Sequence, residues 1–387
     1  MIKRLIVCNL GALLLACAGQ ISASAFIPAT TQATRALDWI QQTKLAADGS
    51  VGGDATRTEE TIWGLAANHR PVAAYLKTGS TSSPIDYLAA NLASEEASAG
   101  SIAQLILAVS AAGQDPTSFG PSGGRRDLLA DLQALYNSST GEFGSDKVFD
   151  HIMAVLAIRS AGRQPAAAAI AFLKGQQKSD GGWSFDNASS FGTDTNTTAL
   201  ALIALASTSS LDGCQVAAAL AYLKTAQQAD GGFPLEAAFP TSDPDSDGFV
   251  IQGLLAVGQD PTGPAWTKAG GKNPLINLLS FQNTDGSFSY PGIQGSNLTA
   301  TTQPLVALAS NHLPISAAGT SFGSPDVPTC EQASSSPTPA ATTSSPSTLP
   351  QTGQPVDLPL AHFPGLLFLL LVLSILLGVT LSLRRNR

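Results

Sequence analysis

The sequence of 387 residues has few basic residues and few cysteines. It contains 20 Lys and Arg against 28 Asp and Glu, which gives a formal net charge of −8, and the basic residues form no patch. Because nucleic-acid binding depends on clustered Lys and Arg, this composition argues against a nucleic-acid partner. With 44% hydrophobic residues, the chain still has ample material for a core.

The number of cysteines limits the folded part of the chain to at most one disulfide. Two of the four cysteines lie near the N-terminus, so only Cys214 and Cys330 remain for the folded part. In an oxidising exterior these two can pair and tie the end of the domain back to its middle. The alternative is a buried Cys214 thiol and a free Cys330, and the sequence leaves both open.

The N-terminus has the composition of a targeting segment. Basic residues precede an apolar run from Leu5 to Ala16, and small residues follow as far as Ala25. This order predicts a secretory signal peptide over residues 1–25, cleaved after Ala25. A lipoprotein signal ending at Cys17 is the alternative, although Leu15 is bulky for that motif.

The C-terminus contains a motif, an apolar segment and a basic tail in that order. Residues 349–353 read LPQTG, residues 365–383 are largely apolar, and residues 384–387 read RRNR. An apolar helix of this length spans about 28 Å, enough to cross a bilayer. The arrangement resembles a cell-wall sorting signal, which implies sortase cleavage between Thr352 and Gly353 and attachment to peptidoglycan. The alternative is a single transmembrane anchor whose arginines stay inside the cell.

Residues 323–348, rich in Ser, Thr and Pro, cannot bury a core and predict an extended stalk. Both interpretations of the C-terminus therefore place the remaining domain, residues 26–322, outside the cell, anchored to the cell wall or plasma membrane. We expect this domain to act as a monomer.

A glycine turn recurs along the domain. Its clearest copies are QKSDGGW from Gln177, QQADGGF from Gln227 and QNTDGSF from Gln282, and weaker copies lie near residues 49, 100 and 141. Each turn stands between two apolar helical segments, of which the second is the more uniformly apolar. Repeats of this kind bury their faces only by stacking on neighbours. The pattern predicts an all-α fold, an (α/α)6 toroid of six helical hairpins, with an open α-solenoid as the alternative.

The Gln before the turn and the aromatic residue after it resemble the QW-type repeats of squalene and hopene cyclases and of protein prenyltransferase β-subunits. The same toroid occurs in the cobalamin carriers. The resemblance implies the fold for nearly all of residues 36–312 and says much less about activity.

The residues that would carry the family's catalysis are missing. The segment nearest to the cyclase DxDD motif is DTNTTA, which has Asn196 where the catalytic acid is expected, and an amide cannot protonate an alkene. For a prenyltransferase zinc site, Asp212 and Cys214 are present, but the only suitably placed histidine, His151, precedes them in the chain. Catalysis of either kind is therefore not expected.

Three acids at alternate positions, Asp243, Asp245 and Asp247, match the opening of an EF-hand-type calcium loop followed by Gly248. The twelfth loop position is Leu254 in place of the bidentate Glu. The segment thus predicts either a weak extracellular calcium site or an acidic helix cap.

Polar residues gather where the second helix of each unit begins, and in a toroid these helix starts share one end of the ring. They serve as caps in one interpretation and form a ligand-binding mouth in the other. The only candidates for acid or base catalysis among them are Glu59, Glu60, Asp150 and His151. The candidate mouth residues are Asp194, Asn196, Thr198, Asp245, Asp247, Thr299 and the turn aromatics Trp183, Phe233 and Phe288.

These observations predict a surface-anchored toroid that acts as a non-catalytic binding or interaction module for a small molecule, in the manner of the cobalamin carriers, or for a surface polymer. The alternative is an enzyme, either a diverged relative of the cyclases and prenyltransferases or an extracellular glycan-acting enzyme with paired carboxylates.

Overall fold

A computed structural model describes residues 28–92, 98–145, 147–187, 192–322 and 326–330. Within these residues the fold consists almost wholly of helices, and no helix there is long and apolar enough to cross a membrane. The predicted signal peptide, sorting motif, membrane span and basic tail lie outside the described residues.

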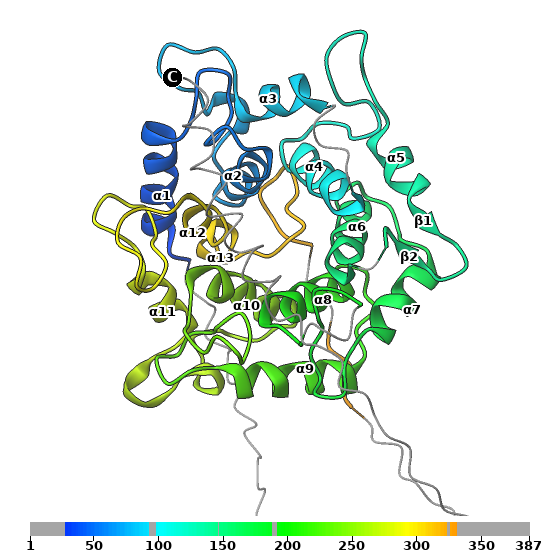
Figure 1. The fold of residues 1–387 in the computed structure, drawn as a ribbon, viewed down its shortest axis with the longest axis vertical. Coiled ribbons are helices and arrows are strands. Elements are labelled where there is room, and N and C mark those ends of the chain that lie inside the picture. The colour runs from blue at the N-terminus through cyan, green and yellow to red at the C-terminus, as the bar shows by residue number, and fades with distance from the viewer. Residues whose placement is uncertain (1–27, 93–97, 146, 188–191, 323–325, 331–387) are drawn as a thin grey trace, which may run out of the picture. The chain divides into compact units, whose positions relative to one another are not determined.

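The helices alternate along the chain between an outer and an inner ring, as the toroid prediction requires (Figure 1). The outer helices are α1 (Thr30–Thr43), α3 (Pro84–Ala90), α5 (Leu128–Ala134), α7 (Ala167–Gly175), α9 (Gly213–Ala226) and α11 (Pro274–Ser280). The inner helices are α2 (Ala55–Ala67), α4 (Ala99–Ala111), α6 (Val148–Ser160), α8 (Thr195–Ser207), α10 (Pro244–Ala256) and the pair α12 (Leu298–Thr302) and α13 (Leu305–Leu308).

Short elements fill the connections between the helices. The strands β1 (Tyr136–Asn137) and β2 (Glu142–Phe143) pair antiparallel around the third glycine turn. The described single-turn 3-10 helices lie at Val72–Ala74, Pro264–Trp266 and Ala269–Gly271.

Composition explains which helix lies inside. The segment forming α8 is almost entirely Ala, Leu, Ile and Thr, and every one of its residues except Asn196 is buried. The outer helix α7 buries only Ala169 and Leu173. A helix that is apolar on all sides must be surrounded by protein, whereas a helix with one apolar stripe can face water. The predicted division into inner and outer helices is therefore confirmed.

The glycine turns are the joints between neighbouring units. The Gln227 side chain donates from Nε2 to the carbonyl of Gly231 in its own turn at 2.9 Å and to the carbonyl of Trp266 at 2.7 Å, just ahead of the next outer helix. Gln177 makes the same pair of bonds, to Gly181 and to Gln215 of α9. Each repeated Gln thus ties one unit to the next.

The last joint closes the ring. Gln282 donates to the carbonyl of Gln32 in α1 at 2.9 Å, although the two residues lie 250 positions apart. Gly286 has a φ of +98°, and a Cβ placed on it would lie 2.4 Å from the carbonyl oxygen of Arg35. Glycine is required here because the left-handed conformation and the close approach of two backbones both exclude a side chain. The sixth unit therefore meets the first as the others meet one another, and the open solenoid does not describe this domain.

The chain after α13 turns back across the C-terminal ends of the inner helices; we call residues 309–322 the strap. Asn311 donates to the carbonyl of Ala67 at the end of α2, and the Arg159 guanidinium at the end of α6 lies 5.3 Å from the centre of the Phe322 ring. Leu313 is buried, and in Figure 1 the orange segment crosses the middle of the ring. The strap therefore closes one end of the ring axis.

A disulfide between Cys214 and Cys330 follows the strap and fastens the chain to the start of α9. Pro328 and Cys330 pack so closely on Gly213 that a Cβ there would overlap their backbone. Residues 326–330 therefore pack on the folded domain, and the rest of the predicted stalk lies outside the described residues.

We expect Gly286→Ala to destabilise the domain by at least about 2 kcal/mol, because it adds backbone strain and a clash with the Arg35 carbonyl. Gly292→Ala is the matched control, since Gly292 also has a positive φ but has open space around it. Urea unfolding of both variants measures the difference, and equal losses would show that the close approach contributes nothing.

We expect Cys214→Ser to lower the free energy of unfolding by about 2–4 kcal/mol, because the disulfide closes a long loop in the unfolded chain. Urea unfolding without reductant should show this loss equally in Cys330→Ser. Wild-type protein measured with reductant should match both variants. A wild-type protein no more stable than the variants would rule out a stabilising bridge.

Candidate functional site

In five of the inner helices, the fourth residue after the N-cap accepts a hydrogen bond from a backbone N–H group just after the preceding turn. We call this residue the latch residue. The latch residues of α2, α8 and α12 are Thr58, Thr198 and Thr301, whose hydroxyls accept from Val51, Trp183 and Phe288. In α6 and α10 the equivalent residues are His151 and Asp247, which accept from Phe143 and Phe233.

His151 is therefore structural, and its prediction as an acid or base is wrong. Its Nδ1 accepts from the Phe143 N–H at 3.1 Å, so Nε2 carries the proton and donates to the Ala169 carbonyl at 3.0 Å. Burial lowers the pKa of His151 to about 4. Both ring nitrogens are engaged in holding the backbone, which leaves none for a substrate.

Two more of the predicted acid or base candidates, Asp150 and Glu59, are buried and do not line the axial pocket. Asp150 is buried against Gly100 of α4. A Cβ placed on Gly100 would lie 2.4 Å from Asp150 Oδ1, so only glycine leaves room for this carboxyl group. Glu59 is buried beside the latch residue Thr58. Of the four candidates, only Glu60 reaches the axial pocket.

Several predicted mouth residues instead hold the helix starts. Asp194 caps α8 by accepting from the Thr197 N–H at 2.6 Å, and burial raises its pKa to about 6. Thr198 is a latch residue, while Asn196 and Thr299 are half-buried at the second position of their helices. Trp183, Phe233 and Phe288 are 0% exposed, which fits the interpretation that they pin the turns against their neighbours and excludes the alternative that they rim a mouth. These aromatics are packed into the joints between units.

The calcium-loop interpretation of residues 243–248 is not supported, because this segment is the N-cap and first turn of α10. Asp243 accepts from the backbone N–H groups of Asp245 and Ser246, and Asp247 acts as a latch residue. The carboxylates point to different partners and do not converge. Among the described residues, no three or more His, Cys, Asp or Glu side chains are arranged to hold a metal ion.

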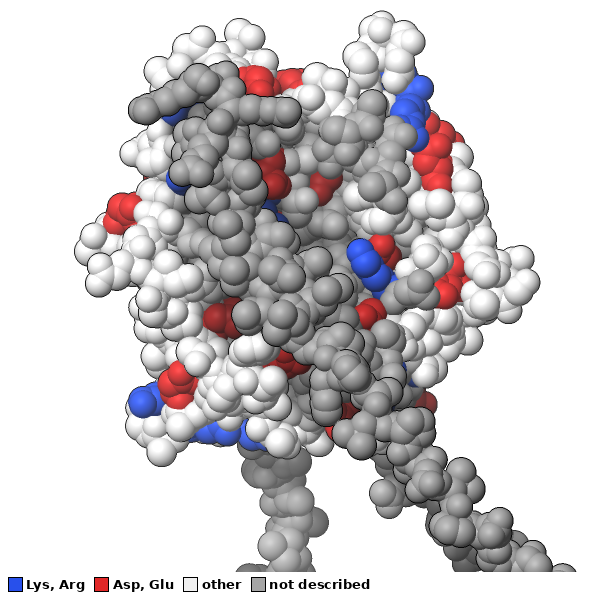
Figure 2. Space-filling view, viewed as in Figure 1, with Lys and Arg blue, Asp and Glu red and all other residues white. Residues whose placement is uncertain are grey.

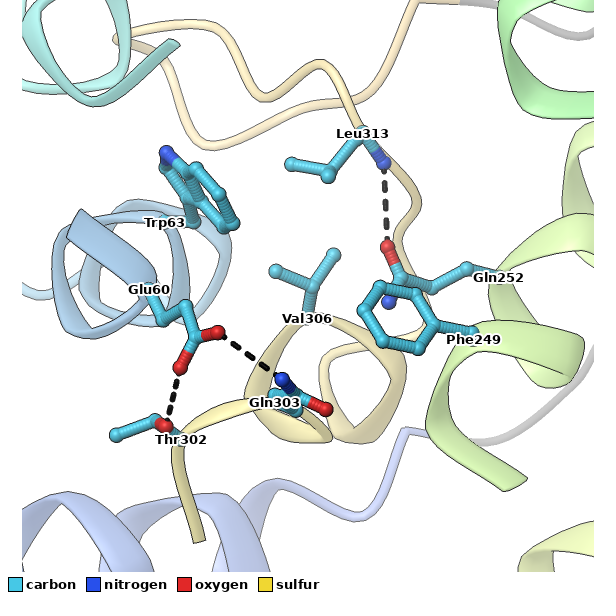
Figure 3. A pocket seen from close by; sticks show the side chains of 8 residues that line it. All are labelled: Glu60, Trp63, Phe249, Gln252, Thr302, Gln303, Val306 and Leu313. Atoms are coloured by element: carbon cyan, nitrogen blue, oxygen red, sulfur yellow. Dashed lines mark hydrogen bonds between the residues drawn. The ribbon is translucent and has the colours of Figure 1, made fainter. Parts of the chain in front are cut away.

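A pocket of about 250 Å³ lies on the ring axis (Figure 3). Three inner helices contribute to it in the same way, with side chains six and nine residues after the N-cap. The lining residues are Glu60 and Trp63 of α2, Phe249 and Gln252 of α10, Thr302 and Gln303 at the end of α12, Val306 of α13, and Leu313 of the strap.

Figure 3 shows how the pocket is built from two aromatic walls and one carboxyl group. Trp63 and Phe249 stand on opposite sides, and Leu313 enters from the strap. The backbone N–H of Leu313 donates to Gln252 Oε1 at 3.3 Å. The strap therefore forms the closed end of the pocket.

Glu60 is the charged group of the pocket and is held from three sides. Thr302 donates to its Oε2 at 2.5 Å, Gln303 donates to its Oε1 at 3.2 Å, and Arg57 Nη1 lies 2.7 Å from Oε2. Burial raises the pKa of Glu60, while the Arg57 charge and the two hydrogen bonds oppose the rise. This carboxyl group is fixed in place, with one edge toward the pocket.

Asp245 places a second carboxyl group one helical turn before Phe249 on the same face of α10. Tyr290 donates to its Oδ2, whereas its Oδ1 is buried and has no hydrogen-bond partner among the described residues. Burial, followed by the neighbouring charge of Asp243 and then that of Glu60, raises the pKa of Asp245 well above its usual range. Asp245 is buried and is not one of the residues that line the axial pocket.

On the α6 and α8 side, the equivalent stripe is apolar. Met153, Leu156, Leu200 and Ile203 occupy the positions six and nine residues after their N-caps, and all are buried. In α4 the residue six positions after the N-cap is the half-buried Gln104, so the polar side chains at these positions come from α2, α4, α10 and the end of α12. This asymmetry distinguishes a site from a ring of identical caps.

Most of the pocket could not be found from the polar pattern at the helix starts. That pattern includes Glu60 but not Trp63, Phe249, Gln252 or Gln303. The signal that was available is the shared spacing of three residues in 60/63, 249/252 and 303/306, counted from aligned N-caps. Leu313 had no such signal, because only the return of the strap brings it to the axis.

No protein-family model and no curated protein matches the sequence. Among solved structures, the fold is similar to that of the type II terpene cyclase MstE from Scytonema, with 14% identity, a TM-score of 0.51, and 72% of this chain and 98% of that chain covered. A variant of the same cyclase holding its product, merosterolic acid A, gives 13% identity, a TM-score of 0.50, and coverage of 73% and 97%.

An α-1,6-mannanase of Salegentibacter in complex with α-1,6-mannotriose gives 10% identity and a TM-score of 0.48, with 73% of this chain and 98% of that chain covered. At these identities the comparisons establish the α/α toroid fold alone. They do not assign an activity.

We expect the stability of the protein to fall as the pH decreases from about 7 to about 4, because His151 stays neutral in the folded state while it charges in the unfolded chain. This contribution to the free energy of unfolding, on the order of 3 kcal/mol, is present above pH 6.5 and is lost by about pH 4.

His151→Thr isolates this contribution, since threonine forms the same latch in three other units. Urea unfolding at several pH values should show a steeper acid loss for the wild type than for this variant. The buried carboxyl groups titrate in both proteins and cancel in the difference. Identical pH profiles would contradict the assignment of a buried neutral histidine.

Proposed function

We propose that this protein is a cell-surface binding module whose axial pocket binds a small polar group of its ligand, such as one hydroxyl-bearing arm of a sugar. The observation that carries the proposal is the Glu60 carboxyl group, held by Thr302 and Gln303, between the walls formed by Trp63 and Phe249. Anchoring through the predicted sorting signal and stalk would present this pocket to the exterior.

The size of the pocket supports a small ligand. The volume of about 250 Å³ includes open solvent, so the space that the protein itself encloses is much smaller and admits only a small group. The strap and the apolar side chains of α6 and α8 are buried around it. A long isoprenoid or a cobalamin therefore does not suit this pocket.

The chemistry of the lining also supports this ligand class. Trp63 and Phe249 offer flat apolar surfaces to the C–H face of a ring, and Glu60, Gln252 and Gln303 offer hydrogen-bonding groups around its edge. Sites of this type use mainly apolar walls with a few placed polar groups to fix orientation. The protein's excess of acidic residues, some of them visible near the middle of the face in Figure 2, favours a neutral or cationic ligand over an anion.

A glycan-acting enzyme is the second candidate, because Glu60 and Asp245 are both buried carboxyl groups with raised pKa values, and the charge of Glu60 contributes to the rise at Asp245. Such pairs supply the acid and the base or nucleophile of glycoside hydrolysis. Cyclase chemistry has no comparable support, since Asn196 occupies the position predicted for the acid.

Trp63 provides the readout for a test. The full chain, purified in a detergent without a sugar headgroup, is titrated with glucose, galactose, mannose and N-acetylglucosamine while tryptophan fluorescence is followed. At least one sugar should change the emission, and Glu60→Gln should weaken its binding at least about 10-fold, because a charge-assisted hydrogen bond is lost.

Glu142→Gln is the matched control, being the same change on β2, where the carboxylate accepts from Asn187 away from the pocket. It should leave the affinity unchanged. The absence of any fluorescence response, or equal effects of the two substitutions, would contradict the proposed binding site. Release of reducing ends by the wild type but not by Glu60→Gln would instead favour the enzyme.

A further inference from the structure

The strap folds back on itself as a small hairpin. The backbone N–H of His312 donates to Ser321 Oγ at 2.7 Å, and the Ser321 hydroxyl donates to the His312 carbonyl at 2.6 Å. Between these residues, the Ser316 N–H donates to the Thr320 carbonyl at 2.9 Å and closes the turn of the hairpin. The strap therefore has hydrogen bonds of its own that do not depend on the ring.

The hydrogen bonds that dock the strap on the inner helices are longer. Asn311 donates to the Ala67 carbonyl of α2 at 3.2 Å, and the Leu313 N–H donates to Gln252 Oε1 of α10 at 3.3 Å. These distances lie at the long end of the range for N–H···O bonds, where the interaction is weaker. The buried side chains of Leu313 and Ile315 add apolar packing. Segments of this kind, bonded within themselves and loosely bonded to their surroundings, tend to open as units.

Both ends of the strap are fixed. At its start the strap continues directly from α13, whose last residue is Leu308. Beyond its end, three residues of sequence lead to the segment that carries Cys330, and the disulfide to Cys214 fastens this segment to the start of α9. Opening of the disulfide would leave the far end of the strap held by noncovalent contacts alone.

The disulfide is accessible to a reductant. Cys214 and Cys330 are both exposed, as are the adjoining Pro328 and Thr329. Exchange requires direct attack of a thiolate on a disulfide sulfur, and exposed disulfides are in general more easily reduced than buried ones. One dithiol supplies the two electrons and two protons that convert the bridge into two thiols, and the dithiol becomes a disulfide. This reaction can take place while the ring stays folded.

The strap occupies space that a ligand of the axial pocket would need. Leu313 lines the pocket, and its backbone is bonded to Gln252, which is also a lining residue (Figure 3). In this state the protein encloses room only for a small group. Undocking of the strap would remove Leu313 from the pocket and uncover the neighbouring Trp63, which is 6% exposed with the strap in place.

We propose that the strap is a lid on the axial pocket and that the Cys214–Cys330 disulfide is its lock, so that the oxidised protein is closed and an external dithiol frees the lid. The opening is a property of the fold alone. Its role in controlling access of a ligand rests on the proposed function.

Hydrogen exchange tests the lock. The full chain is compared in its oxidised form and after reduction with dithiothreitol, with loss of the bridge verified by thiol counting. Peptides covering the strap should exchange at least 10-fold faster after reduction, while peptides of the buried helix α8 should keep their protection. Cys214→Ser should show the fast exchange of the strap without any reductant.

Trp63 reports whether the lid covers the pocket. Reduction should increase the quenching of tryptophan fluorescence by acrylamide, because removal of Leu313 exposes the indole ring. The Trp63→Phe variant should lose this increase. Dithiothreitol added to Cys214→Ser is the matched control and should change neither exchange nor quenching, since the variant has no bridge to open.

Two outcomes would overturn the proposal. A reduced protein whose strap exchanges like that of the oxidised protein would show that the bridge locks nothing, and equal acceleration in the strap and in α8 would show unfolding of the whole ring. The sugar titration then separates the two proposals. Failure of every sugar to bind either form would contradict the proposed function and leave the lid, whereas equal sugar affinity in both forms would contradict control of access by the strap.

Discussion

The close approach of each glycine turn to the backbone of the next outer helix is the contact on which the ring depends. At this joint one unit places a residue with positive φ against a carbonyl of its neighbour, and a glutamine donates to both sides. The geometry repeats from Gly49, packed on Ser83, to Gly286, packed on Arg35. Because the last copy meets the first helix, the same local contact that stacks the units also closes them into a ring.

Closure of the ring surrounds the inner helices with protein, so the polar residues at their starts need hydrogen-bond partners within the protein. Five of the six units have a latch residue that ties the inner helix to the turn before it, and the residue can be Thr, His or Asp because only one accepting atom is needed. Most polar groups at the helix starts are thereby committed to the backbone. Glu60 of α2 is an exception, because its carboxyl group lines the axial pocket, where Thr302 and Gln303 at the end of α12 donate to it.

The strap makes the two ends of the ring different. With Leu313 held against Gln252 and Cys330 fastened to Cys214, one end of the axis is filled by the protein's own chain. The remaining pocket is small and is lined by Glu60, Trp63 and Phe249 among others.

The sequence by itself determined the repeat, the alternation of inner and outer helices, and the absence of the cyclase acid at Asn196, because these depend on composition and on spacing within a unit. It also identified Glu60 as a candidate, but placed His151 and Trp183 with the site when the structure uses both for packing. Local pattern cannot distinguish an acceptor that bonds its own turn from one that faces the axis. Only the tertiary structure decided this, since the pocket brings together residues about 240 positions apart, such as Glu60 and Thr302, and the strap returns to close it.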